Sequence, residues 1–191
     1  MRDDVIDLTR RLVAIDSVNP DLVPGGAGET EIAAFVASWL EDAGLDVARE
    51  EVGAGRWNVV GTARGSGGGR SLMLNAHMDT VGVGGIDAPF DVREENGRLY
   101  GRGAYDMKAS LAAIMLAGAR AAREGLSGDV VVTAVADEEV ASIGSAAIAA
   151  SRSADAAIVA EATQERVLEL ALGHGVSCSQ TALAAGGGGA A

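Results

Sequence analysis

Residues 71–80 read SLMLNAHMDT, and this stretch decides the fold because a candidate ligand pair directly follows an apolar run. The run from Ser71 to Ala76 is apolar on both faces, which is typical of a central strand covered by helices on both sides. His77 and Asp79 follow two residues apart, so they can share one face. His77 can bind a metal through one ring nitrogen while Asp79 accepts a hydrogen bond from the other. An isolated His-x-Asp pair is more often incidental, so further segments have to support it.

Two more apolar runs end in acidic residues. Residues 129–136 lead into Asp-Glu138-Glu139, and residues 156–160 lead into Glu161. Ligands at strand ends converge at one edge of a sheet, where open α/β folds place their sites. One histidine and several carboxylates suit a divalent ion such as zinc, and without a cation the carboxylates would repel one another. A solvated acidic turn and a helix or turn cap are the alternatives for the glutamate pair and Glu161.

Residues 101–108 read GRGAYDMK and precede a long alanine-rich segment. The two glycines permit unusual backbone angles just before a helix. Asp106 would start that helix, where it could cap the N-terminus. It could instead place one oxygen on each of two metal ions. A cap needs no Gly-x-Gly upstream, which favours the bridging role.

The hydrophobic periodicity predicts an alternation of helices and strands along the chain. The predicted helices are 5–15, 29–43, 107–124 and 142–150, and the predicted strands are 45–52, 58–62, 71–76, 129–136, 156–160 and 167–172. This order implies an α/β protein, a three-layer α/β/α sandwich with a mixed, largely parallel sheet. We expect strand 45–52 near an edge, a hairpin-type loop at the glycine-rich residues 64–70, and an irregular segment at 80–96 that is a surface loop or the rim of the site.

Composition narrows the possible partners and the compartment. The 191 residues include 27 acidic and 15 basic ones, and the net charge of −12 disfavours nucleic acid and anionic membrane surfaces as partners. Cys178 is the one cysteine, so an intrachain disulfide and a thiolate metal cluster are excluded. The charged, amphipathic N-terminal segment resembles neither a signal peptide nor a membrane span, so we expect a cytoplasmic protein.

Together, four segments resemble the M20 metallopeptidases, a group that includes acetylornithine deacetylase, succinyl-diaminopimelate desuccinylase, carboxypeptidase G2 and aminoacylase-1. They are residues 77–80 (HMDT), 101–108, 137–139 (DEE) and 161–163 (EAT). Their combination is specific, although each piece is not. The resemblance implies a zinc-peptidase-like catalytic domain. It also implies a hydrolase that cleaves an amide bond of N-acylated amino acids or small peptides through a water activated by two zinc ions, with cobalt as a possible substitute.

The resemblance also implies roles for the ligands. His77 and Glu161 would bind one ion, Glu139 would bind the other, and Asp106 would bridge the two. A cis peptide bond would join Asp106 to Met107.

Two further residues would be catalytic by the same resemblance. Asp79 would orient the histidine, and Glu138 would be the general base. The chain departs from the family pattern at Ala162, where proline is usual, and at Ala109, where glycine is common.

The family pattern continues beyond this chain, with an inserted dimerisation domain and a final histidine ligand. We therefore expect a C-terminally incomplete, partial M20-type catalytic domain over 1–175, an atypical low-complexity tail over 176–191, and no dimerisation domain, although full-length relatives would be homodimers. His174 is interpreted as a loop residue. One hypothesis is the zinc amidohydrolase, and the alternative is a truncated or frameshifted, non-catalytic remnant. In either case we expect the chain alone to show little or no amidase activity with added zinc.

Overall fold

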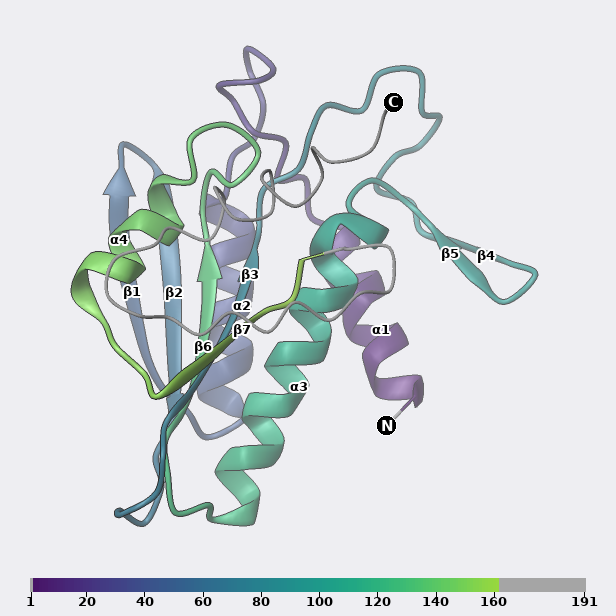
Figure 1. Ribbon diagram of the computed structural model, residues 1–191. Coiled ribbons are helices and arrows are strands. Elements are labelled where there is room, and N and C mark those ends of the chain that lie inside the picture. The colour runs from purple at the N-terminus through teal and green to yellow at the C-terminus, as the bar shows by residue number, and fades with distance from the viewer. Residues whose placement is uncertain (1, 162–191) are drawn as a thin grey trace, which may run out of the picture.

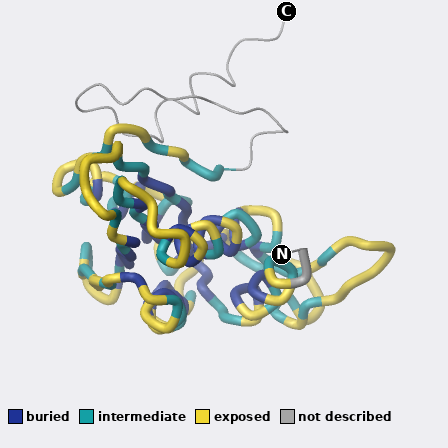
Figure 2. The backbone as a smooth tube through the Cα atoms, turned by 90° about the horizontal axis from the view of Figure 1, so that it is seen from below, coloured by how far each residue is buried: buried dark blue, intermediate teal, exposed yellow. Residues whose placement is uncertain are grey.

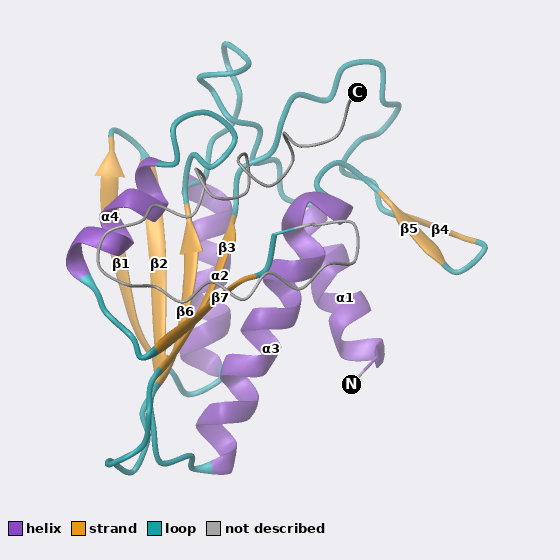
Figure 3. Cartoon of the chain, viewed as in Figure 1, coloured by secondary structure: helices purple, strands orange, loops and turns teal. Residues whose placement is uncertain are grey.

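The computed structural model describes residues 2–161, which form a mixed sheet with helices on both faces (Figures 1 and 3). The main sheet has five strands in the order β1-β2-β6-β3-β7. The elements are α1 (Arg2–Val13), α2 (Thr30–Asp42), β1 (Asp46–Gly53), β2 (Arg56–Ala63), β3 (Leu72–His77), β4 (Arg93–Glu95), β5 (Arg98–Tyr100), the irregular turn η1 (Ala104–Lys108), α3 (Ala109–Glu124), β6 (Val130–Val135), α4 (Ile143–Ser151) and β7 (Ala156–Val159).

The sheet brings the carboxyl ends of three strands to one edge. Strand β3 pairs in parallel with β6 on one side and β7 on the other, whereas β2 is antiparallel to both β1 and β6. Strand β2 therefore runs against the other four, and the predicted mixed, largely parallel sheet is confirmed with β1 at an edge. His77 lies opposite Val135, and Asn75 lies opposite Val159, so the segments after β3, β6 and β7 begin side by side.

Alternating side chains divide the core between the two faces of the sheet. Along β6, Val130, Val132 and Ala134 join the larger core formed with α1, α2 and α3. Val135 instead joins a smaller cluster with Ile148 of α4 on the opposite face. The period of two is that of a strand buried on both sides. The three-layer prediction is confirmed, with most of the buried apolar residues on the side of the long helices.

Helix α3 lies close to the sheet at a glycine. A Cβ added at Gly118 would lie 2.5 Å from Cγ2 of Val132 and 3.3 Å from Cδ2 of Leu45. Glycine costs helix stability, so its place here is explained by the close approach of the helix to β6. The valine side chain fills the space that a larger helix residue would take.

The loop at residues 64–70 is not the predicted hairpin, because β6 lies between β2 and β3. The loop runs along the turn that precedes β6: the N–H of Ser66 donates to the carbonyl of Leu126 at 2.9 Å. A Cβ added at Gly65 would lie 2.6 Å from the carbonyl of Gly128. The glycines thus permit two backbones to pack together, and they do not form a tight turn between neighbouring strands.

A hairpin occupies part of the segment that was expected to be irregular. Strands β4 and β5 pair across Asn96-Gly97, whose φ values of 51° and 73° are those of a two-residue type I′ turn. The hairpin projects from the body of the protein (Figure 1), and most of its residues are exposed (Figure 2).

Some predictions concern residues beyond the described part. The predicted strand 167–172, the low-complexity tail, His174 and Cys178 all lie outside residues 2–161. Within that range no helix has both the length and the apolar character that a membrane crossing requires.

The contact between α3 and β6 gives a first prediction. Gly118→Ala is expected to lower the free energy of unfolding by about 1–3 kcal/mol, because the new methyl group overpacks against Val132. In a Val132→Ala background the same substitution should be neutral or stabilising, since space is available and alanine favours the helix by ~1 kcal/mol. Urea denaturation of the four proteins in this double-mutant cycle measures the coupling. An equal effect of Gly118→Ala in both backgrounds would contradict the close contact.

Candidate metal centre

His77 is the last residue of β3, and its side chain is almost fully buried, with 1% exposed. Nδ1 lies 2.9 Å from the backbone carbonyl of Asp79 and 3.5 Å from its carboxylate. Nε2 lies 3.1 Å from Oδ1 of Asp106. Nδ1 therefore contacts Asp79, mainly its backbone carbonyl, while Nε2 faces the acidic cluster.

The carboxylate of Asp79 holds the turn that carries both glutamates. It is buried and accepts hydrogen bonds from the backbone N–H groups of Glu138 at 3.0 Å and Glu139 at 3.1 Å, and from Nδ2 of Asn19 at 2.7 Å. Burial raises the pKa of Asp79, but contacts with His77 and these donors outweigh it and hold the pKa below its usual value. Asp79 thus stays ionised and links the ends of β3 and β6.

Asp106 lies in η1 with non-helical backbone angles of φ −119° and ψ 99°. Helix α3 begins at Ala109, two residues later than predicted, so Asp106 is not at its N-cap. The Asp106–Met107 peptide bond is cis, as the family resemblance implied. Sδ of Met107 accepts the backbone N–H of His77 at 3.1 Å, which joins this turn to the end of β3.

Glycine permits the approach of η1 to the sheet. Gly103 precedes the turn with φ +77°, and a Cβ there would lie 2.6 Å from Cγ2 of Thr80. Gly103 therefore lets the backbone pass close to the strand end, and Asp106 lies beside His77 as the sequence predicted.

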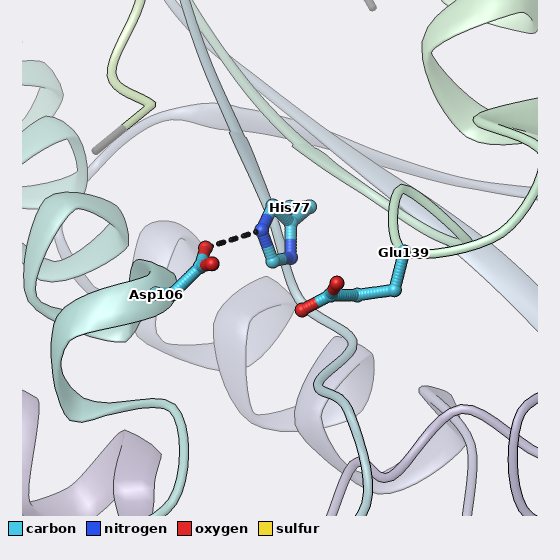
Figure 4. A group of neighbouring side chains, drawn as sticks. All are labelled: His77, Asp106 and Glu139. Carbon is cyan, nitrogen blue, oxygen red and sulfur yellow. Dashed lines mark hydrogen bonds and ion pairs between the residues drawn. The ribbon is translucent and has the colours of Figure 1, made fainter. Parts of the chain in front are cut away.

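The remaining predicted ligands complete two overlapping groups that share His77. Nε2 of His77 lies 3.8 Å from Oε2 of Glu138 and 3.9 Å from Oε2 of Glu161. Possible ligand atoms of His77, Asp106 and Glu139 all lie within 4.8 Å of one another, and the same holds for His77, Glu138 and Glu161. Figure 4 shows Asp106 and Glu139 reaching toward the imidazole from separate segments. Each predicted ligand therefore lies in one of the two groups, and Glu138 lies as near the histidine as Glu161 does.

The charges in this cluster shift one another's pKa values. Burial lowers the pKa of His77, but hydrogen bonds to Asp106 and Asp79 and the nearby negative charges outweigh it and raise the pKa to about 11. Burial, reinforced by Asp106, Asp79 and Glu138 and opposed by His77, raises the pKa of Glu139 to about 7.

The pKa of Glu138 is raised too, mainly by burial and also by neighbouring carboxylates, against the opposing charge of His77. Without a metal, the centre thus favours binding protons. A donor set of one imidazole and several crowded carboxylates fits a divalent cation.

Sequence reasoning missed a buried polar network behind the cluster. It joins Asn19, Glu29, Arg56 and Asp137 to Asp79. Neither Asn19 nor Arg56 was assigned a role from the sequence. Lys108 is also fully buried; its Nζ donates to the carbonyl of Ile15 at 2.7 Å, and burial lowers its pKa to about 7 against the opposing charge of Asp16.

The chain is similar in sequence to proteins that are named as a desuccinylase, a deformylase and a deacetylase. The chain is 34% identical over 151 residues to a succinyl-diaminopimelate desuccinylase of Parvibaculum lavamentivorans, covering 73% of this chain and 35% of the relative. It is 32% identical over 153 residues to an N-formyl-4-amino-5-aminomethyl-2-methylpyrimidine deformylase of Bacillus subtilis, covering 75% and 34%. It is 31% identical over 176 residues to an acetylornithine deacetylase of Proteus mirabilis, covering 88% and 45%. The chain thus spans between about a third and a half of these relatives.

Solved structures share the fold, and a family profile matches the sequence. An M20 family metallo-carboxypeptidase from Sulfolobus solfataricus superposes with a TM-score of 0.68 at 24% identity, covering 82% of this chain and 37% of that one. A tripeptidase from Staphylococcus aureus also gives a TM-score of 0.68, at 25% identity, covering 85% and 44%. The profile of peptidase family M20/M25/M40 matches residues 73–178, which include all the predicted ligands. The chain therefore belongs to peptidase family M20/M25/M40.

Proposed function

We propose that this chain supplies the metal-binding part of a zinc-dependent hydrolase that cleaves an amide bond of N-acylated amino acids or small peptides. The observation that carries the proposal is the convergence of one imidazole and four carboxylates at the edge where β3, β6 and β7 end. The names of the relatives support the reaction, since they describe removal of succinyl, acetyl and formyl groups from amines.

Four side chains would hold two zinc ions. In this assignment His77 and Glu161 bind one ion, Glu139 binds the other, and Asp106 bridges them. Oδ1 of Asp106 lies 3.1 Å from Nε2 of His77, and 52% of the Asp106 side chain is exposed, so an ion could reach this carboxylate. Zinc bound here would polarise the amide carbonyl and lower the pKa of the attacking water.

Glu138 would accept and return the proton. Its side chain is partly exposed, and its pKa is raised mainly by burial, so it can take a proton and later release it to the leaving amine. Asp79 would keep His77 in place and would hold the backbone of Glu138 through the 3.0 Å hydrogen bond. By geometry Glu138 could also bind a metal, because its carboxylate shares a possible ligand group with His77 and Glu161. Its role as the proton acceptor comes from the family resemblance.

The described residues do not favour the alternative of a non-catalytic remnant. Each ligand predicted within residues 2–161 is present, and each lies in one of the two groups around His77. The buried support behind Asp79 is complete as well, with donors from Asn19, Glu138 and Glu139.

Turnover separates the hydrolase from the remnant. If the chain is catalytic by itself, purified protein with zinc should release amine from at least one N-acetyl, N-succinyl or N-formyl amino acid or small peptide, and a chelator should abolish the release. Glu138→Gln should lower the rate by about 10²–10⁴-fold, because it removes the proton acceptor. Amine release is followed with a fluorogenic reagent. Zinc binding without turnover on any compound would favour the remnant and would agree with the expectation of an inactive isolated chain.

Zinc stoichiometry distinguishes the two neighbouring glutamates. We expect Glu138→Gln to keep two zinc ions, Glu139→Gln to lose one, and Asp106→Ala to lose both because the bridge is gone. Elemental analysis of gel-filtered protein gives the zinc content per chain, with the exposed Glu124→Gln in α3 as a control that should keep both ions. Loss of zinc from Glu138→Gln with retention in Glu139→Gln would reverse the two roles.

Proton release on metal binding follows from the histidine. Because the pKa of His77 is about 11 without metal, the imidazole carries a proton at pH 7.5 that a metal must displace. We expect zinc binding to release at least one proton per chain. For each proton displaced, zinc affinity should decrease about tenfold when the pH is lowered by one unit. Calorimetry in buffers of different ionisation enthalpy measures the release. A zinc-binding enthalpy that is independent of the buffer would contradict this account.

A further inference from the structure

Asn19 joins two buried carboxylates with a single amide nitrogen. Its Nδ2 lies 2.7 Å from Oδ2 of Asp79 and 3.0 Å from Oδ1 of Asp137, and all three residues are buried. The side-chain oxygen accepts the backbone N–H of Asp21 at 3.0 Å. Every polar atom of this amide therefore has a partner, and both of its N–H groups point at negative charge.

The orientation of the amide is fixed by these partners. With the oxygen and nitrogen exchanged, the oxygen would face two carboxylates and the NH₂ group would face an N–H donor, which leaves no favourable contact. An asparagine satisfies this environment, whereas an aspartate would add a third negative charge between the other two.

The main chain fixes Asn19 against the end of β3. The N–H of Asn19 donates to the carbonyl of Thr80 at 2.9 Å, and the N–H of Thr80 donates to the carbonyl of Ser17 at 3.0 Å. Oγ of Ser17 also donates to the carbonyl of Met78 at 2.8 Å. Residues 17–19 thus run beside residues 78–80, and this pairing holds the backbone of Asn19 next to the end of β3.

On its other side, Asn19 contacts a turn that is held by an ion-pair network. Asp137 has a left-handed backbone, with φ +61°, and its N–H donates to Oε1 of Glu29 at 3.0 Å. The guanidinium of Arg56 donates to Oδ1 of Asp137 at 3.1 Å and makes two bonds to the fully buried Glu29, at 2.6 and 2.7 Å. Charges buried this deeply need such pairing, and the single positive charge of Arg56 contacts both carboxylates.

We propose that Asn19 is a positioning residue: by tying Asp79 to Asp137, it sets the distance between His77 and the turn that presents Glu138 and Glu139. Asp79 contacts the imidazole and accepts the N–H groups of both glutamates, so a displacement of Asp79 or Asp137 moves ligands from two strands at once. The inference rests on the proposed metal centre for its consequence, whereas the tie itself is a property of the metal-free protein.

The test replaces Asn19 by leucine, which has a similar size and no donors. Asn75→Leu is the matched control: Asn75 is a partly buried asparagine on β3 whose Nδ2 donates to Oγ1 of Thr133 at 2.8 Å, within the sheet. Hydrogen exchange of the Glu138 and Glu139 amides is measured by NMR in metal-free protein. Asn19→Leu should speed this exchange by on the order of tenfold or more relative to the control, because Asp79 is no longer held.

Zinc affinity gives the second measurement. In chelator competition, Asn19→Leu should bind zinc about 10–100-fold more weakly, as expected when support behind a ligand is lost, and the cobalt-substituted protein should show a changed d–d absorption spectrum. Asn75→Leu should keep both properties. Unfolding by urea is measured in parallel, and both variants are expected to lose stability through the loss of a hydrogen-bonded side-chain amide.

The outcomes separate the inference from the proposed function. Loss of stability in Asn19→Leu with unchanged exchange at Glu138 and Glu139 would overturn the positioning role. Faster exchange in a protein whose wild type binds no zinc would uphold the tie and refute the metal centre. If Asn19→Leu does not fold, Asn19→Ser, which is too short to reach both carboxylates, gives the same comparison.

Discussion

The carboxylate of Asp79 is the interaction on which the candidate centre depends. It is buried, ionised and shared by three parts of the chain: the asparagine before Pro20, the end of β3, and the turn after β6. A buried charge is tolerated where several donors surround it, and here those donors belong to the segments that must be brought together. The same contacts that satisfy Asp79 therefore specify where His77, Glu138 and Glu139 lie.

The other constraint is repulsion among the ligands themselves. One imidazole faces carboxylates from three segments. Despite its burial, hydrogen bonds to Asp106 and Asp79 and the nearby negative charges raise the pKa of His77 to about 11. Burial, reinforced by neighbouring carboxylates, raises the pKa of Glu139 to about 7. Such crowding is unfavourable for the apo protein, so the geometry has to be imposed from outside the cluster. Close glycine contacts at η1, the parallel register of β3 with β6, and the Arg56 network supply that external support.

The parts of this structure that sequence could predict are those with a local signal. Apolar runs located the strands that carry the ligands, and their acidic ends indicated the shared edge. The position of β6 between β2 and β3 was not accessible, because strand order depends on distant pairing. Asn96-Gly97 is a typical hairpin turn sequence, but the strands on either side are short and charged, so no apolar alternation indicated a hairpin there. Asn19 and Asp137 are 118 residues apart in the sequence, so no local sequence pattern could have indicated their contact.

The candidate ligands come from positions as distant as 77 and 161, and no two strands supply them alone. In an unfolded chain these groups are far apart, so an ion that requires all of them can bind the folded state but not the unfolded one. Such an ion acts as a reversible cross-link across the sheet. At a free concentration 100 times its dissociation constant it would add about 2.7 kcal/mol to the stability of the fold. The metal supply of the cell would then influence how much of the chain is folded.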